Sequence, residues 1–145
     1  MNLYKKYKEV IESLKNEKGV IEVKVGDKLV SDQSPTFIIA EAANNHMCDM
    51  KMAKKLVDNA YEAGADAIKF QTYKANRLVR KEATLYWDGK ETSQLEYYSN
   101  LDKFDKDDYI ELFDYAIKKG ILPFSTPFDV HSASMLNDLS AGLYK

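Results

Sequence analysis

Apolar residues in this chain form short, nearly continuous runs that alternate with stretches of helical spacing. Three such runs predict buried strands over about residues 37–42, 67–72 and 121–125. Strands that are apolar along most of their length are typical of parallel sheets, which are covered on both faces. Because a helical stretch follows each strand, the pattern predicts an α/β fold with right-handed crossovers.

The helical stretches have clear start and stop signals. Asp49 is a good N-cap residue for a helix that ends before Gly64. The buried stripe of that helix is formed by Ala53, Leu56, Val57 and Ala60. Asp105 caps a second helix over 106–119, and Gly120 ends it. These signals fix two strand–helix units.

One more helix and the start of a fourth strand follow the third strand. The helix begins at Asp129 or Ser132, and residues 143–145 open the fourth strand. The inward positions of this helix are Ala133, Leu136 and Leu139. The sequence therefore predicts three units of a strand followed by a helix, and then the start of a fourth strand.

A different pattern precedes these units. Residues 3–16 predict a helix, and residues 20–30 predict a hairpin around Gly26-Asp27. The apolar face of the helix is formed by Tyr4, Tyr7, Val10, Ile11 and Leu14. We therefore divide the chain into an N-terminal helix and hairpin over 1–34 and a partial β/α domain over 35–145.

The connection over residues 74–104 is long for a β/α fold. It contains Trp87 and Asp88-Gly89, and a short helix is predicted near 92–99. Long connections at the carboxyl ends of strands often carry function. A surface excursion held by its aromatic residues explains the same pattern, and both interpretations stay open.

Composition and charge exclude several classes of protein. Of the 145 residues, 45% are hydrophobic and 30% charged, which is typical of a folded globular chain. The net charge of -2 gives no electrostatic case for nucleic acid. No apolar run approaches the ~20 residues of a membrane span, and residues 1–16 do not resemble a signal peptide. With one cysteine no intrachain disulfide forms, so we expect a cytoplasmic protein.

Charged residues at two predicted strand ends are candidates for chemistry. Glu41 ends the first strand, and Lys69 lies inside the second. A charge in such a strand is costly unless it is paired or used. Glu41 is either catalytic or part of a salt bridge, for instance to Lys69. Lys69 is suited to a Schiff base, to an anion such as phosphate, or to a structural ion pair.

Polar residues near the same edge complete the set of candidates. Gln71 shares the face of Lys69, because side chains alternate along a strand. Ser125 and Thr126 end the third strand, where hydroxyl groups suit a phosphate but also occur in ordinary turns. Asn45 and His46 follow the first strand, where they either line a sugar site or serve loop hydrogen bonding.

No metal site is predicted from these residues. The two histidines, His46 and His131, do not have the spacing of a local metal motif, and His131 is expected at the surface. Cys48 has no base tied to it by sequence, so a nucleophilic role is not indicated.

Taken together, the segments at the strand ends resemble the sialic acid synthase family, which makes N-acetylneuraminate, legionaminic and pseudaminic acids. The resemblance covers about residues 20–145, hairpin included. It is carried by Phe37-Ile38-Ile39-Ala40-Glu41, Asn45-His46, Asp49, Gly64 to Ala75, Gly120-Ile121 and Ser125-Thr126-Pro127-Phe128-Asp129.

This resemblance implies a (β/α)₈ (TIM-type) barrel, plugged by the hairpin and followed by a small antifreeze-like domain, usually in a homodimer. It implies a transferase that condenses phosphoenolpyruvate with N-acetylmannosamine or a related N-acyl sugar. A divalent metal, Mn or Mg, would polarise the sugar aldehyde. The histidines that bind this metal in the family lie on later strands, so no metal ligand is expected in this chain.

The resemblance also implies roles for single residues. Glu41 would be the acid–base group, and Lys69 and Thr126, with Ser125 beside it, would bind phosphoenolpyruvate. Gln71 would position the substrates. Lys145 matches a further phosphate-binding lysine on the fourth strand.

Two departures from the family pattern matter. The family often has Asn-His-Asn-Gly after the first strand, and this chain has Met47-Cys48 in place of the last two residues. A barrel of this type needs about 250 residues, and the chain has 145. We therefore expect the N-terminal part of a synthase that is inactive alone. A non-catalytic half-barrel partner and an aldolase-type barrel are the alternatives.

Overall fold

The computed structural model describes residues 3–17, 19–85, 93–139 and 142–145. Residue contacts divide the chain into two units, Met1–Phe37 and Ile38–Lys145. Each unit is described by itself. Trp87 and Asp88-Gly89 lie outside the described residues.

The first unit contains one helix and one hairpin, as its pattern predicts. Helix α1 spans Leu3–Ser13, and strands β1 (Glu22–Val25) and β2 (Lys28–Ser31) pair antiparallel. The helix is shorter than predicted because the chain turns back after it. The Glu22 N–H donates to the Leu14 carbonyl at 3.1 Å, and Lys15 bridges Ile21.

The apolar face predicted for α1 is present but not buried. Tyr7 is 63% exposed, Val10 49% and Ile11 43%. Among described residues 5–37, none is buried. The first unit therefore has no core of its own in the part of the chain described.

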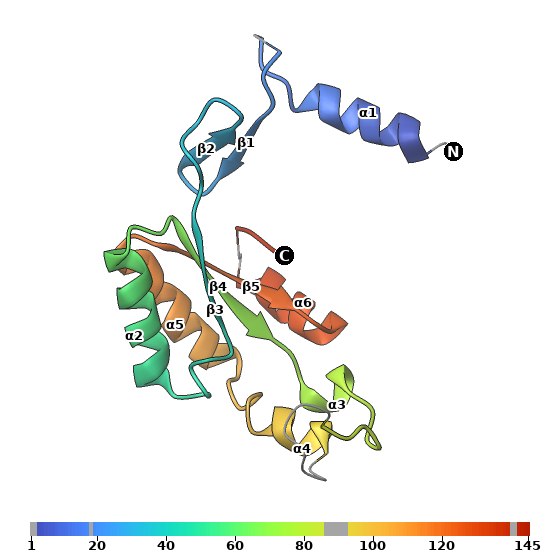
Figure 1. Ribbon diagram of the computed structural model, residues 1–145, viewed down its shortest axis with the longest axis vertical. Coiled ribbons are helices and arrows are strands. Elements are labelled where there is room, and N and C mark those ends of the chain that lie inside the picture. Colours follow the sequence, from blue (N-terminus) through green and yellow to red (C-terminus); the bar gives the residue numbers. More distant parts are fainter. Residues whose placement is uncertain (1–2, 18, 86–92, 140–141) are drawn as a thin grey trace. The chain divides into compact units, whose positions relative to one another are not determined.

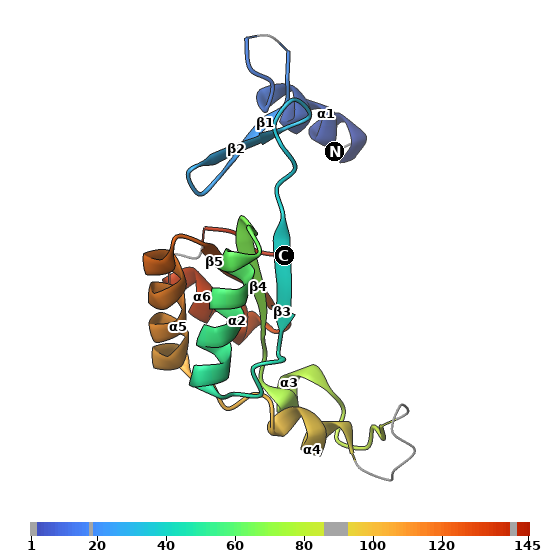
Figure 2. The ribbon, with the colours of Figure 1, turned by 60° about the vertical axis from the view of Figure 1, so that its left-hand side comes forward.

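The second unit is a parallel sheet covered by helices. Its elements are β3 (Ile39–Ala43), α2 (Met50–Glu62), β4 (Ala67–Thr72), α3 (Ala75–Leu78), α4 (Gln94–Ser99), α5 (Lys106–Lys119), β5 (Leu122–Pro127) and α6 (Val130–Asp138). The strand order is β3-β4-β5, and both neighbouring pairs are parallel. Helices α2 and α5 lie side by side against one face of this sheet (Figures 1 and 2). The α/β prediction is confirmed.

Helix caps explain why the element boundaries follow the sequence signals. The Asp49 carboxylate accepts a hydrogen bond from the Met52 N–H at 2.8 Å. Asp105 and Asp108 form a reciprocal capping box at the start of α5. Gly120 has φ 98°, a left-handed conformation that glycine adopts without the usual steric cost. Strand β5 runs two residues further than predicted, because Thr126 and Pro127 continue its pairing with β4.

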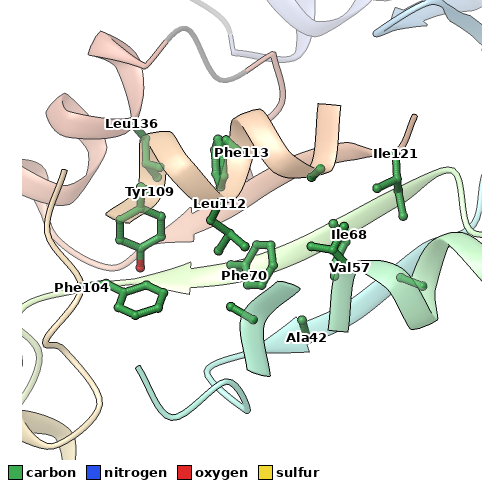
Figure 3. Packing of buried hydrophobic residues seen from close by; sticks show 13 residues of the cluster. Ala42, Val57, Ile68, Phe70, Phe104, Tyr109, Leu112, Phe113, Ile121 and Leu136 are labelled. Carbon is green, nitrogen blue, oxygen red and sulfur yellow. The ribbon is translucent and has the colours of Figure 1, made fainter. Parts of the chain in front are cut away.

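The core lies between the sheet and the helices. Ile68 and Phe70 of β4 project towards α2 and α5, where Val57, Leu112 and Phe113 surround them (Figure 3). Burial of each such side chain contributes about 1.5–3 kcal/mol relative to exposure. Of the inward positions predicted for α6, Leu136 is fully buried, while Ala133 and Leu139 are only partly buried.

The long connection between β4 and α5 contains α3 and α4, beyond the carboxyl end of β4 (Figure 1). Its two ends are fastened together. The Lys74 ammonium donates to the carbonyls of Asp102 (2.7 Å) and Phe104 (3.2 Å). In return, the Asp102 carboxylate accepts the Ala75 N–H at 2.7 Å. The described part of this connection is thus anchored at its base.

The residues that end the chain lie beside β5. Tyr144 forms a parallel bridge with Ser125, at the position where a fourth strand was predicted. Within the described ranges, we find no helix that combines the length and apolar character needed to cross a membrane.

Candidate functional site

Strand β4 has one face towards the helices and one face away from them, and its candidate residues lie on the second. Ile68 and Phe70 face the helices, so Lys69 and Gln71 face the opposite side of the sheet. This second face carries the charged and polar residues that follow.

Lys69 and Glu41 form an ion pair on this face. They are direct partners in the β3–β4 ladder, and the Lys69 ammonium contacts Glu41 Oε2. The side chain of Lys69 is 6% exposed and that of Glu41 is 53% exposed. A lysine held as an ammonium beside a carboxylate is a poor start for a Schiff base, which needs the neutral amine. The contact is the ion pair that the sequence offered as one alternative for both residues.

A β-bulge fixes the carboxylate of Glu41. The register shifts between Glu41 and Ala43, and Ala43 has φ 51°. The Ala43 N–H donates to Glu41 Oε1 at 3.1 Å. Bulges of this kind re-aim side chains next to active sites. Both carboxylate oxygens of Glu41 are therefore engaged.

The ion pair lies in a pocket of about 380 Å³. Its lining residues are Ile39, Glu41, Lys69, Phe124, Leu143, Tyr144 and Lys145. The pocket thus brings together three of the predicted residues, two cationic and one anionic. Its excess of positive charge is suited to a small anion with an apolar portion.

Gln71 and Thr126 lie opposite each other one step further along the strands. They are partners in the β4–β5 ladder, after the pair Lys69 and Phe124. The Thr126 hydroxyl is buried, and no described residue is its hydrogen-bond partner. An unpaired buried hydroxyl costs about 1–3 kcal/mol. This hydroxyl therefore stays without a partner among the described residues.

Ser125 does not join this group. It is fully buried, and its hydroxyl lies 2.7 Å from Thr72 Oγ1. Because side chains alternate along β5, Ser125 and Thr126 point to opposite faces of the sheet. The structure gives no support to Ser125 as a substrate ligand and places it in the core.

His46 is also drawn into the interior. It is 2% exposed and stacks on Phe104 at 4.7 Å, with the edge of its ring near Phe70. Its Nδ1 accepts the Cys48 N–H at 3.1 Å, so Nε2 carries the proton. Burial lowers the pKa of His46. These contacts match the loop-bonding alternative, because the ring packs on the core side and not beside Lys69.

The remaining polar residues of the β3–α2 loop lie near the surface. Asn45 is exposed, whereas the Asn44 amide donates to the Tyr73 hydroxyl at 3.0 Å. Burial raises the pKa of Tyr73 to about 12. Asn45 is thus left as the loop side chain that is open to a ligand.

Met47 and Cys48 occupy unusual backbone conformations. Their φ angles are 51° and 55°, in the left-handed region that asparagine and glycine favour. These are the two positions where the chain departs from the family's Asn-Gly. Met47 and Cys48 therefore differ from Asn-Gly in residue type but have the left-handed backbone conformation that asparagine and glycine favour.

A divalent metal does not fit the described residues. Nowhere in the described ranges do three or more His, Cys, Asp or Glu side chains gather as a metal site. The charged residues that line the pocket are Lys69, Lys145 and Glu41, whose carboxylate already pairs with Lys69. Hard cations require several oxygen ligands. An anion is the ligand that this donor set fits.

Sequence reasoning missed Phe124, which is buried and lines the pocket beside Lys69. The signal was available, since Phe124 and Thr126 share one face by alternation. The Ala43 amide was also missed, because no sequence signal announces this bulge.

Comparisons with known proteins show the family of the chain. The NeuB family matches residues 56–145, more than half of the chain. N,N'-diacetyllegionaminic acid synthase of Campylobacter jejuni is 38% identical over 115 residues, which cover 76% of this chain and 34% of that protein. N-acetylneuraminate-9-phosphate synthase of Homo sapiens is 35% identical over 122 residues, or 80% of this chain and 33% of that protein. The chain therefore spans about a third of the length of these curated relatives.

A solved structure gives the same result. The crystal structure of N-acetylneuraminic acid synthetase from Leptospira borgpetersenii, in complex with citrate, superposes with a TM-score of 0.71 at 32% identity. The match covers 85% of this chain and 40% of that one. The chain belongs to the NeuB family of sialic and legionaminic acid synthases.

Proposed function

We propose that this chain supplies the phosphoenolpyruvate-binding part of a nonulosonic acid synthase. The observation that carries the proposal is the pocket that joins buried Lys69 to Glu41 and Lys145. The unpaired hydroxyl of Thr126 adds a donor for the phosphate or carboxylate of the substrate.

The proposed reaction condenses phosphoenolpyruvate with N-acetylmannosamine or a related N-acyl sugar. The methylene carbon of phosphoenolpyruvate bonds to the aldehyde carbon of the sugar, and the aldehyde oxygen takes up a proton. Water adds to the phosphate-bearing carbon of phosphoenolpyruvate and gives up a proton, and the bond from that carbon to the phosphate oxygen then breaks and releases phosphate. Lys69 and Lys145 stabilise the phosphate charge. Glu41 accepts a proton from the water, which requires that its carboxylate be released from Lys69. Gln71 and Asn45 contact the substrates from the strand end and the loop.

The proposal extends to the parent fold. In the proposed parent, residues 35–145 form the N-terminal part of a (β/α)₈ barrel. A homodimer and a divalent metal belong to this proposal by family resemblance. No step is assigned to the metal here, because the described residues do not fit it.

Binding of phosphoenolpyruvate to the 145-residue chain tests the proposal. Isothermal titration calorimetry should detect binding, and Lys69→Met should weaken it at least about tenfold, since a charge-assisted hydrogen bond contributes about 1.5–3 kcal/mol. Lys54→Met is the matched control, because Lys54 pairs with Glu111 on the helix surface. Equal affinities for wild type and Lys69→Met would overturn the proposal.

Turnover by the chain alone is a second test. With phosphoenolpyruvate, N-acetylmannosamine and manganese, we expect no sustained release of phosphate. Sustained release would show that residues 1–145 contain a complete site. A phosphoenolpyruvate titration without turnover separates binding from catalysis.

A further inference from the structure

We propose that Glu41 is an internal competitor for the anion site, so that an incoming anion must displace its carboxylate from Lys69. This inference deepens the proposed function and rests on it. It describes an autoinhibitory contact that the free chain makes with its own acid–base residue.

The contact occupies the position that an anion needs. Glu41 Oε2 contacts the Lys69 ammonium, and Glu41 is the partner that the described residues give to this cation. The side chain of Lys69 is almost fully buried, and it lines the pocket together with Glu41. A phosphate or carboxylate that enters the pocket therefore meets a lysine that is already neutralised.

The two partners differ in their freedom to move. The side chain of Glu41 is 53% exposed and that of Lys69 only 6%. Water solvates a displaced Glu41 carboxylate, whereas a buried ammonium left without a partner is costly. The exchange therefore moves Glu41 and leaves Lys69 in place.

The bulge amide provides a pivot for this movement. The Ala43 N–H holds Glu41 Oε1 at 3.1 Å, independently of Lys69. When Oε2 leaves Lys69, this hydrogen bond keeps the carboxylate at the edge of the pocket. The anion thus fills the site and also frees Glu41 for acid–base catalysis. It follows that the anion binds before the sugar.

Removal of the internal carboxylate should tighten anion binding. In Glu41→Gln, affinity for inorganic phosphate and for phosphoenolpyruvate should rise about five- to tenfold, since near-surface charge pairs are worth on the order of a factor of ten. Glu111→Gln removes an equivalent carboxylate from the Lys54 pair and should leave both affinities unchanged. This control separates a local effect from a change of net charge.

Calorimetry on the whole chain decides between the outcomes. Tighter binding in Glu41→Gln alone supports the inference, and unchanged or weaker binding overturns it. If neither wild type nor variant binds either anion, the proposed function fails together with the inference. If wild type binds and Glu41→Gln binds no more tightly, only the inference fails. Should Glu41→Gln not fold, Glu41→Asp takes its place: the shorter carboxylate withdraws from Lys69, and an affinity no higher than wild type would overturn the inference.

Discussion

Ser125 and Thr72 share a buried hydrogen bond of 2.7 Å on the helix side of the sheet, one residue away from the buried hydroxyl of Thr126, which has no partner among the described residues. Two adjacent hydroxyls thus have separate tasks. Ser125 joins two strands inside the core, whereas Thr126 is proposed to donate to a substrate. Matched substitutions can separate these tasks.

Ser125→Ala should lower the free energy of unfolding by about 1–2 kcal/mol, because the Thr72 hydroxyl loses its partner in the interior. Phosphoenolpyruvate affinity should stay unchanged. Urea denaturation and calorimetry measure the two quantities. Loss of binding with unchanged stability would return Ser125 to the substrate site.

Thr126→Val should have the reverse effect. The free energy of unfolding should rise by about 1–3 kcal/mol, since valine keeps the shape and removes a buried hydroxyl that has no partner among the described residues. Affinity for phosphoenolpyruvate should fall severalfold. Calorimetry compares the phosphoenolpyruvate affinities of Thr126→Val and Ser125→Ala. Equal affinities in the two variants would contradict the assignment of Thr126, and not Ser125, to substrate binding.

His46 should make stability depend on pH. The folded-state pKa of His46 lies below its ordinary value of 6.5, because burial disfavours the cation. Above about pH 6.5 both states are neutral and stability is fully present. As pH falls below 6.5, only the unfolded state takes up the proton, so stability drops by at most about 1.4 kcal/mol per pH unit.

Urea denaturation between pH 5 and 7.5 measures this slope. His46→Asn keeps an acceptor for the Cys48 N–H and should flatten the slope. His131→Asn is the control, because His131 is exposed, and it should leave the slope as in wild type. An unchanged slope in His46→Asn would assign the pH dependence to other groups.

Met47→Asn should stabilise the chain by about 0.5–1 kcal/mol, because asparagine tolerates the left-handed conformation at φ 51°. Met47 is 63% exposed, so little packing is lost. Thermal and urea unfolding measure the gain. Met52→Asn is the contrast: Met52 is exposed within α2, where asparagine lowers helix propensity and should destabilise slightly.

Asp102→Ala should loosen the described parts of the β4–α5 connection. It removes the carboxylate that accepts the Ala75 N–H, although the Asp102 carbonyl remains for Lys74. Hydrogen exchange should accelerate at residues 75–79 and stay slow in β4. Asp107→Ala, an exposed change in the first turn of α5, serves as the control. Uniform acceleration in both variants would point to global destabilisation instead.

Local signals predicted the second unit well. Helix α5 begins after Asp105 and ends before Gly120, as its cap residues indicate, because capping depends on neighbours in the sequence. Strand β4 likewise follows its apolar run from Ala67 to Thr72. A salt bridge between Glu41 and Lys69 was one of the alternatives for these residues, and it is present.

Other features depend on contacts that no local pattern contains. His46 is buried because Phe104, distant in the sequence, provides a ring for it to stack on. The apolar stripe of α1 predicted a buried face, but periodicity does not say what covers it. Ser125 was grouped with Thr126 by proximity, whereas strand geometry separates them.

The bulge at Ala43 has a consequence for transplanting this site. It inserts one residue into β3, so that Ala43 and not Ala42 lies opposite Phe70. A designer who copied only the side chain of Glu41 onto a regular strand would lose the amide that holds it and shift the following loop by one position. Residues 41–43 therefore need to be transferred together, because the Ala43 N–H holds Glu41 Oε1. An alignment that removes the inserted residue would shift the loop after it by one position.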